Sequence, residues 1–89
     1  MKAIVSVFSK DRIGIIADVC TVLADMRVNV LDLSQTIMDG VFTMVTLADT
    51  ATSDLTFEQI QERLAREGQR LGLSIRIQRK DIFDAMHQI

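Results

Sequence analysis

Four stretches of the chain have the apolar and β-branched composition of β-strands. Residues 2–8 are apolar on both alternating sets, which is typical of a strand in the middle of a sheet. Residues 28–38 alternate imperfectly, and residues 41–48 are β-branched and apolar. Residues 73–80 alternate cleanly, as expected of an edge strand with one solvated face. The inward positions of this last strand are Leu73, Ile75 and Ile77.

Between the first two strands, residues 14–27 have the apolar period of an α-helix. The apolar arc is wider than one sheet face would cover, and we interpret its second flank as a surface for another subunit. The arc consists of a stripe, Ile16, Val19, Cys20 and Leu23, and a flank, Ile15, Val22 and Met26.

A second helix is predicted from Thr56 to about Leu71. Thr56 and Gln59 have the spacing of a capping box, and Gly72 is placed to end the helix. Before it, Asp39 and Gly40 separate two strand-like runs, which indicates a type I′ hairpin turn. One face of the predicted helix holds Phe57, Ile60, Leu64, Gly68 and Leu71.

The element order predicts an α+β fold, a ferredoxin-like βαββαβ sandwich with a four-stranded antiparallel sheet. Right-handed crossovers put both helices on one face and leave the other open. We expect residues 1–80 to form one domain and residues 81–89 to be its C-terminal helical extension. The extension has an apolar stripe and is too short to be helical alone, so it is expected to dock on something. The stripe consists of Ile82, Phe83, Met86 and Ile89.

Composition and charge exclude several classes of protein. The 89 residues are 48% hydrophobic and 25% charged, with a formal net charge of -2. One domain of this balance lacks the basic surface of a general nucleic-acid binder. No apolar run approaches the ~18–20 residues of a membrane span, so we expect a cytoplasmic protein. A core this small, without disulfide or metal, favours a homo-oligomer.

Reactive side chains are few. The single histidine, His87, lies near the C-terminus, and Cys20 is expected to be a buried, inert thiol. No cluster of histidine and cysteine residues indicates a metal site. The sequence therefore predicts a protein that is not an enzyme and needs no cofactor.

The segment from Lys10 to Gly14 has functional character, because it leads from a strand into a helix. Unpaired amides at a helix N-terminus, with the helix dipole, can hold a small carboxylate. Asp11 could instead cap the helix, and composition alone favours that interpretation. Asn29, after the helix, can donate and accept at once, which suits an amino acid. Its alternative role is a turn residue that satisfies its own backbone.

At these residues a family resemblance emerges. The run from Lys10 to Val19, continued by residues 23–25 and 28–30, resembles the signature of ACT domains, with Ile13 where the family usually carries proline. Ser34-Gln35-Thr36, Asp39-Gly40, Phe42-Thr43-Met44 and residues 82–86 are similar to the short stand-alone UPF0237 proteins. The loop also resembles modules of the glycine cleavage repressor and of formyltetrahydrofolate deformylase.

The resemblance implies a regulatory module that binds an amino acid, or a similar small carboxylate, at the interface of a homodimer or higher homo-oligomer. Amides at Ile13 to Ile15 would hold the carboxylate, and Asn29 the ammonium. A protein-interaction module without a small ligand stays open, as does a small acylphosphatase-like enzyme, whose phosphate loop the chain lacks. The implied ligand-binding residues are Asp11, Arg12, Ile13, Gly14, Ile15, Asn29, Val30 and Leu31.

Overall fold

Seven helices and strands follow one another in the predicted order. The computed structural model describes residues 1–86, apart from the side chains of Phe83 and Met86, so the inferences drawn on His87 and Ile89 lie outside the described residues. A C-terminal helix is present as predicted. The elements are β1 (Lys2–Lys10), α1 (Ile15–Asp25), β2 (Asn29–Met38), β3 (Val41–Asp49), α2 (Phe57–Leu71), β4 (Ser74–Arg79) and α3 (Lys80–Met86).

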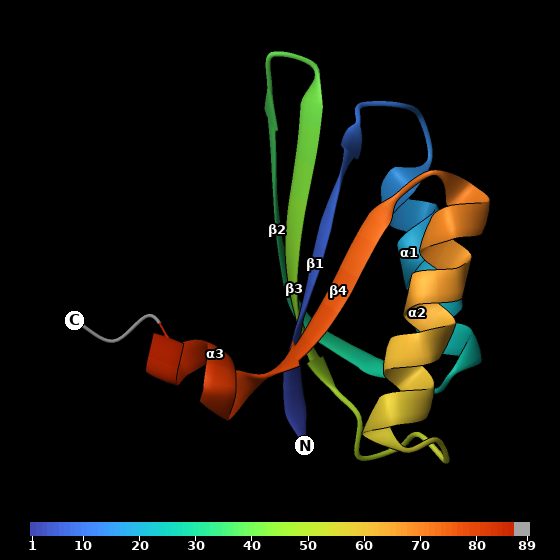
Figure 1. The fold of residues 1–89 in the computed structure, drawn as a ribbon, viewed down its shortest axis with the longest axis vertical. Coiled ribbons are helices and arrows are strands. Elements are labelled where there is room, and N and C mark those ends of the chain that lie inside the picture. Colours follow the sequence, from blue (N-terminus) through green and yellow to red (C-terminus); the bar gives the residue numbers. More distant parts are fainter. Residues whose placement is uncertain (87–89) are drawn as a thin grey trace.

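The four strands form one antiparallel sheet in the order β2-β3-β1-β4. β1 is central and β4 lies at an edge, as the apolar patterns of the two strands predict. Figure 1 shows α1 and α2 together on one face of the sheet, with α3 on the opposite side. The predicted ferredoxin-like fold is confirmed.

Local sequence signals account for the turns and caps. Asp39 and Gly40 both have positive φ, 52° and 77°, as a type I′ turn requires. At the start of α2, the amide of Gln59 donates to Thr56 Oγ1 at 3.2 Å, and the Thr56 amide donates to Gln59 Oε1 at 2.9 Å. The predicted hairpin and capping box are both confirmed.

A β-bulge explains the imperfect alternation of the second strand. Val30 pairs with Ala48 and Asp32 pairs with Leu47, so Leu31 is an extra residue. An inserted residue shifts the side-chain alternation by one position. Beyond the bulge, Leu33 and the other odd-numbered positions of β2 therefore face the helices.

The prediction of a subunit surface on the first helix is wrong. Ile15, Val22 and Met26 are buried within the single chain. α1 contacts β2 and also α2, so its wide apolar arc is covered by two neighbours in the same chain. Cys20, expected to be buried, is only half-buried, because it lies at the margin of the buried face of α1.

One polar group in the core lacks a partner. Thr46 is fully buried, and its Oγ1 makes no hydrogen bond within the described residues. Thr46→Val removes this hydroxyl with little change of shape and is expected to raise the free energy of unfolding by about 1 kcal/mol. Denaturant unfolding measures the change. Thr43→Val, at a half-buried position of the same strand, is the control, and a destabilised Thr46→Val would contradict the prediction.

Candidate functional site

The loop between β1 and α1 is attached to the hairpin at the same end of the sheet. The amide of Asp11 donates to the carbonyl oxygen of Gly40 at 2.9 Å. α1 begins at Ile15, with Gly14 as its N-cap and no side chain hydrogen-bonded to its first turn. The interpretation of Asp11 as the cap is therefore wrong. Because the first amides of a helix have no intrahelical partner, they remain available here.

A hollow of about 180 Å³ lies beside this loop. β1 and β2 both run antiparallel to β3, so they point the same way and their last residues meet the loop at one end. The order of strands could have indicated this, but Gln35 and Ile37 of β2 and Phe42 of β3 were missing from the predicted site. The lining residues are Asp11, Arg12, Gly14, Ile15, Ile16, Ala17, Gln35, Ile37 and Phe42.

Arg12 is engaged within its own chain. Its Nη1 donates to the carbonyl oxygen of Ile13 at 3.0 Å, and its Nη2 donates to that of Leu71 at 3.2 Å. Nη2 also lies 3.1 Å from the Asp18 carboxylate. The guanidinium thus holds the loop against the last turn of α2, where helix carbonyls favour a cation. Arg12 is a positioning residue of the loop in this arrangement.

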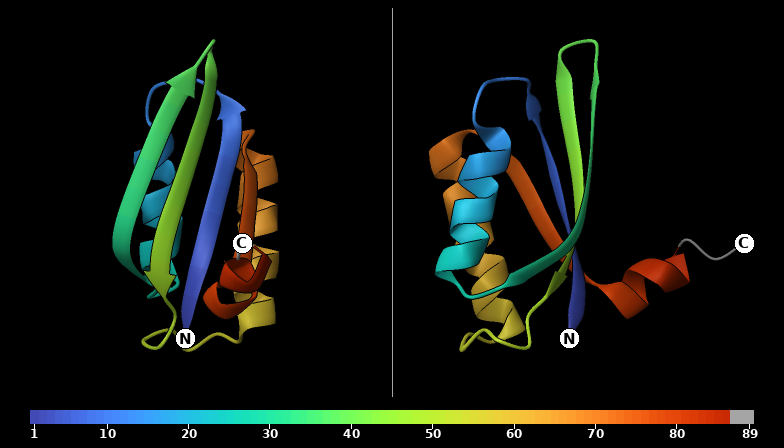
Figure 2. Two further views of the ribbon diagram at one scale, coloured as in Figure 1. Left: turned by 90° about the vertical axis from the view of Figure 1, so that its left-hand side faces the viewer. Right: turned by 180° about the vertical axis from the view of Figure 1, so that it is seen from behind.

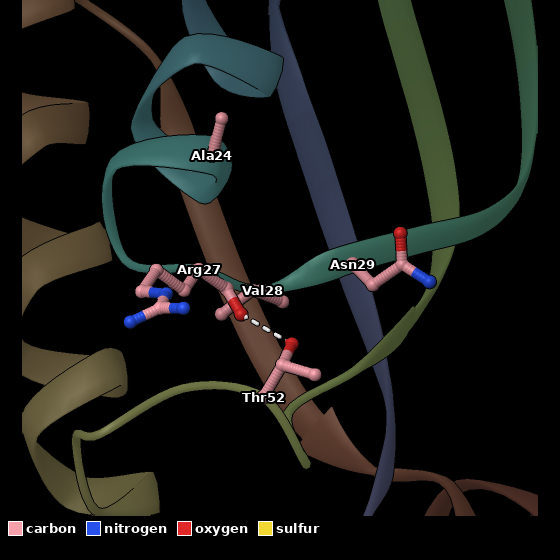
Figure 3. A pocket seen from close by; sticks show the side chains of 5 residues that line it. All are labelled: Ala24, Arg27, Val28, Asn29 and Thr52. Carbon is pink, nitrogen blue, oxygen red and sulfur yellow. Dashed lines mark hydrogen bonds between the residues drawn. The ribbon is translucent and has the colours of Figure 1, made fainter.

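Asn29 lies at the other end of α1 from the loop. The 11 residues of α1 span about 16 Å, so Asn29 and Arg12 do not meet in one chain. A wider hollow of about 440 Å³ adjoins Asn29 and Thr52. Figure 3 shows the Arg27 and Asn29 side chains pointing away from each other, while the Thr52 hydroxyl donates to the Arg27 carbonyl at 2.8 Å. These diverging side chains form no convergent site by themselves.

Asp49 pairs with Asn29 in the register of β2 and β3. A hydrogen bond from the Ala51 amide, 3.0 Å long, is the main cause that lowers the pKa of the Asp49 carboxyl. The N-terminal ammonium, 3.4 Å away, lowers this pKa further. The end of the sheet that holds Asn29 therefore keeps a negative charge at neutral pH.

The remaining predicted site residues are spread around these two ends. Ile13 is 98% exposed at the tip of the loop, whereas Ile15 is buried beneath it. Val30 is half-buried and Leu31, in the bulge, is exposed. The structure thus brings Asp11 to Ile15 together and places Asn29 to Leu31 at the opposite end of the molecule.

No described helix is long and apolar enough to cross a membrane. Nor do the described residues contain a group of three or more histidine, cysteine, aspartate or glutamate side chains placed to hold a metal ion.

Comparison with known proteins identifies the family. A family model of the ACT domain matches residues 2–78. A UPF0237 protein of Clostridium acetobutylicum is 46% identical over 89 residues, which is 100% of both chains. The structure of an ACT domain protein from Streptococcus pneumoniae aligns over 98% of each chain, with 37% identity and a TM-score of 0.84.

A more distant structure shares the fold alone. Formyltetrahydrofolate deformylase from Pseudomonas syringae pv. tomato aligns with 88% of this chain and 27% of its own, at 21% identity and a TM-score of 0.77. ACT domains are regulatory modules that bind small molecules. With a family model over most of its length and relatives matched end to end, the chain belongs to the ACT domain family and, within it, to the UPF0237 proteins.

Proposed function

We propose that this chain is a non-enzymatic regulatory module that senses an amino acid, and that two copies of the chain complete each ligand site. The observation that carries the proposal is the uncapped N-terminus of α1, which opens beside the hollow. There the free amides of Ile15, Ile16 and Ala17 can donate to a carboxylate, and the helix dipole adds a favourable field.

Among the residues that line the hollow, Asp11 and Gln35 carry side-chain oxygens that can accept hydrogen bonds from the ammonium of the same ligand, and both side chains are exposed. Two other groups that suit an ammonium, Asn29 and the ionised Asp49, lie at the far end of α1. The proposed shared site uses the far end of another copy, because Asp49 there adds an ionised carboxylate beside the Asn29 amide.

The edge strand β2 supports a dimer of this kind. None of its ten residues is buried, and Leu31, Ile37 and Met38 are exposed. Long edge strands without protection pair readily with other strands, and β2 carries a single charge, Asp32. The other edge, β4, is only six residues long and carries Arg76 and Arg79, so it is the better protected of the two.

A two-fold axis perpendicular to the sheet would pair β2 with β2 of the second copy in antiparallel fashion. The start of one strand then lies beside the end of the other. This brings Asn29 of one copy toward the hollow of the other, near Ile37. The carboxylate of the ligand would contact one chain and its ammonium the other, so ligand binding would stabilise the dimer and shift the assembly equilibrium.

The site is tested with two variants that spare the fold. Ala17→Asp adds a negative charge at an exposed position of the first helical turn, where it suits the helix but repels a carboxylate. Asn29→Ala removes the proposed ammonium partner. Each variant alone is expected to weaken amino-acid binding at least about 10-fold, measured by thermal shift and calorimetry over the common amino acids. Ala17→Asn is the neutral control.

Mixing the two variants tests whether the site is shared. After subunit exchange, about a quarter of all sites combine an intact loop with an intact Asn29, and binding is expected to return to that extent. Absence of recovery would refute the shared site. A wild-type protein whose melting temperature no amino acid raises at millimolar concentration would refute sensing itself.

The exposed β2 edge also favours a second candidate, a protein-interaction module without a small ligand. A stable wild-type dimer that responds to no amino acid would support it. The acylphosphatase-like alternative receives no support from the geometry, because Arg12 is engaged by Asp18 and by Leu71, and Asn29 lies at the other end of α1.

A further inference from the structure

The sheet face opposite α1 and α2 is apolar along its two central strands. The register of β1 and β3 places Ile4 beside Leu47, and Phe8 beside Thr43, on this face. Val45 and Val41 follow on the same side of β3. The flanking strands are mostly polar here, with Asp32, Ser34 and Thr36 on β2 and Ser74, Arg76 and Gln78 on β4, while the exposed Met38 ends β2 beside Val41. Such an apolar centre with a polar rim resembles a protein interface.

Among the described residues, one end of this face is covered and the other is exposed. β4 ends opposite Ala3, and α3 follows directly and contacts the two strands β1 and β4. At that end Ile4 is 7% exposed, whereas Phe8, on the same strand and the same face, is 47% exposed. Val41 and Val45 are exposed as well. We name Phe8, Val41 and Val45 the distal patch.

Within the described part of its own chain, α3 contacts β1 and β4 and no other helix or strand. Figure 2 shows that it extends away from the sheet, on the side opposite α1 and α2. Ile82 on this helix is 48% exposed. Its carboxylates, Asp81 and Asp84, pair with the nearby Arg79 and Lys80, and all four side chains keep a third or more of their surface in solvent. The helix thus presents an apolar side chain with acidic neighbours.

Basic side chains flank the distal patch. Lys10 lies on the same face beside Val41. Arg76 lies beside Ser6, which precedes Phe8 by two residues on the same strand and face. Neither cation makes an ion pair among the described residues. Asp81 and Asp84 keep 66% and 51% of their side-chain surface in solvent. Because such exposed ion pairs are weak, the same carboxylates can also face the cations beside the distal patch.

We propose that the distal patch is the docking site for α3 of a second copy of this chain, and that the exchange is reciprocal. In this arrangement the open sheet faces of two copies face each other. The two-fold axis that relates them runs parallel to the sheets and perpendicular to the strands, so the strands of the second copy run in the opposite direction. The end that carries α3 then faces the distal patch of the other sheet. Because a helix is about 10–12 Å thick with its side chains, the two facing sheets would stand further apart than the ~10 Å of directly packed sheets, and the two α3 helices would fill the space between them.

This interface uses a face of the sheet, whereas the proposed amino-acid site uses the β2 edge. The two associations are compatible, and neither depends on the other. Failure of one leaves the other standing.

A disulfide tests the arrangement. α3 starts at the Ala3 end of β1, and Phe8 lies five residues further along, about 17 Å away. A disulfide needs Cα atoms within about 7 Å, so cysteines introduced at positions 8 and 82 cannot join within one chain. In a Cys20→Ser background, oxidation of the double variant Phe8→Cys/Ile82→Cys is expected to yield covalent dimers on a non-reducing gel. The two single-cysteine variants are the controls, and they are expected to run largely as monomers on that gel.

Sedimentation supplies the second measurement. Ile82→Asp is expected to halve the mass of the wild-type assembly with an unchanged circular dichroism spectrum, because Ile82 is half exposed in the single chain. Ile82→Val is the conservative control and should keep the assembly. A double-cysteine variant that remains monomeric after oxidation would overturn the proposal, as would an Ile82→Asp variant that keeps the wild-type mass.

Discussion

Ile15→Ala is expected to lower the free energy of unfolding by about 2–5 kcal/mol, the largest effect of any change proposed for this chain. Ile15 is 2% exposed and belongs to the core cluster under the sheet. Removal of three carbons leaves a cavity, because the surrounding side chains relax only in part. Ile13→Ala makes the same chemical change two residues away, at a side chain that is 98% exposed, and is expected to cost less than about 0.5 kcal/mol.

Urea unfolding of the two variants provides the comparison, with the protein concentration held constant. The contrast tests the corrected assignment of α1, in which Ile15 supports the chain's own core. If Ile15→Ala changed only the oligomeric state and left the stability of the folded chain intact, the original interpretation as a subunit surface would be restored.

Gly68→Ala is expected to destabilise the protein by about 1–3 kcal/mol, although alanine is the better helix former. A Cβ at this position would lie 2.7 Å from the carbonyl oxygen of Leu73 and 3.4 Å from Ile75 Cγ1. The first of these atoms is backbone, and the Leu73 amide is already bonded to the Gly68 carbonyl at 2.8 Å. Since the chain turns back directly onto Gly68, α2 must move away from β4 to make room. This cost exceeds the ~1 kcal/mol that alanine gains in helix propensity.

Gly72→Ala separates crowding from backbone strain. Gly72 has φ 73°, and nothing lies within 4 Å of a Cβ built there. Its substitution is expected to cost about 1 kcal/mol, from the left-handed backbone alone. Thermal and denaturant unfolding rank the two variants. A Gly68→Ala protein as stable as the wild type would show that α2 and β4 are not packed as closely as the structure indicates.

Local signals along the chain were sufficient for the elements and their order. Each of these signals depends on neighbours a few residues apart. They are the positive-φ turn at Asp39 and Gly40, the reciprocal cap of Thr56 and Gln59, and the alternation of residues 73–80. The right-handed preference of crossover connections then leaves few ways to connect such elements. The topology could therefore be predicted without any knowledge of long-range contacts.

The candidate site was predicted only in its local part. The loop from Asp11 to Ile15 was singled out because it joins a strand to a helix. Gln35 and Phe42 were missed because they come to the loop through the pairing of β2 and β3. The role of Arg12 was also beyond a sequence argument, since its guanidinium reaches the Leu71 carbonyl, 59 residues away along the chain.

The sequence by itself determined the βαββαβ order, the hairpin, the caps of α2 and the loop, because turn chemistry and side-chain periodicity act over a few residues. The tertiary structure decided which side of α1 is buried, where the bulge at Leu31 shifts the faces of β2, and that Asn29 lies a helix length from the loop. It also decided that α3 leaves the distal end of the open face uncovered. These features depend on how the layers pack, and one apolar stripe fits several rotations of a helix about its axis until its neighbours are in place.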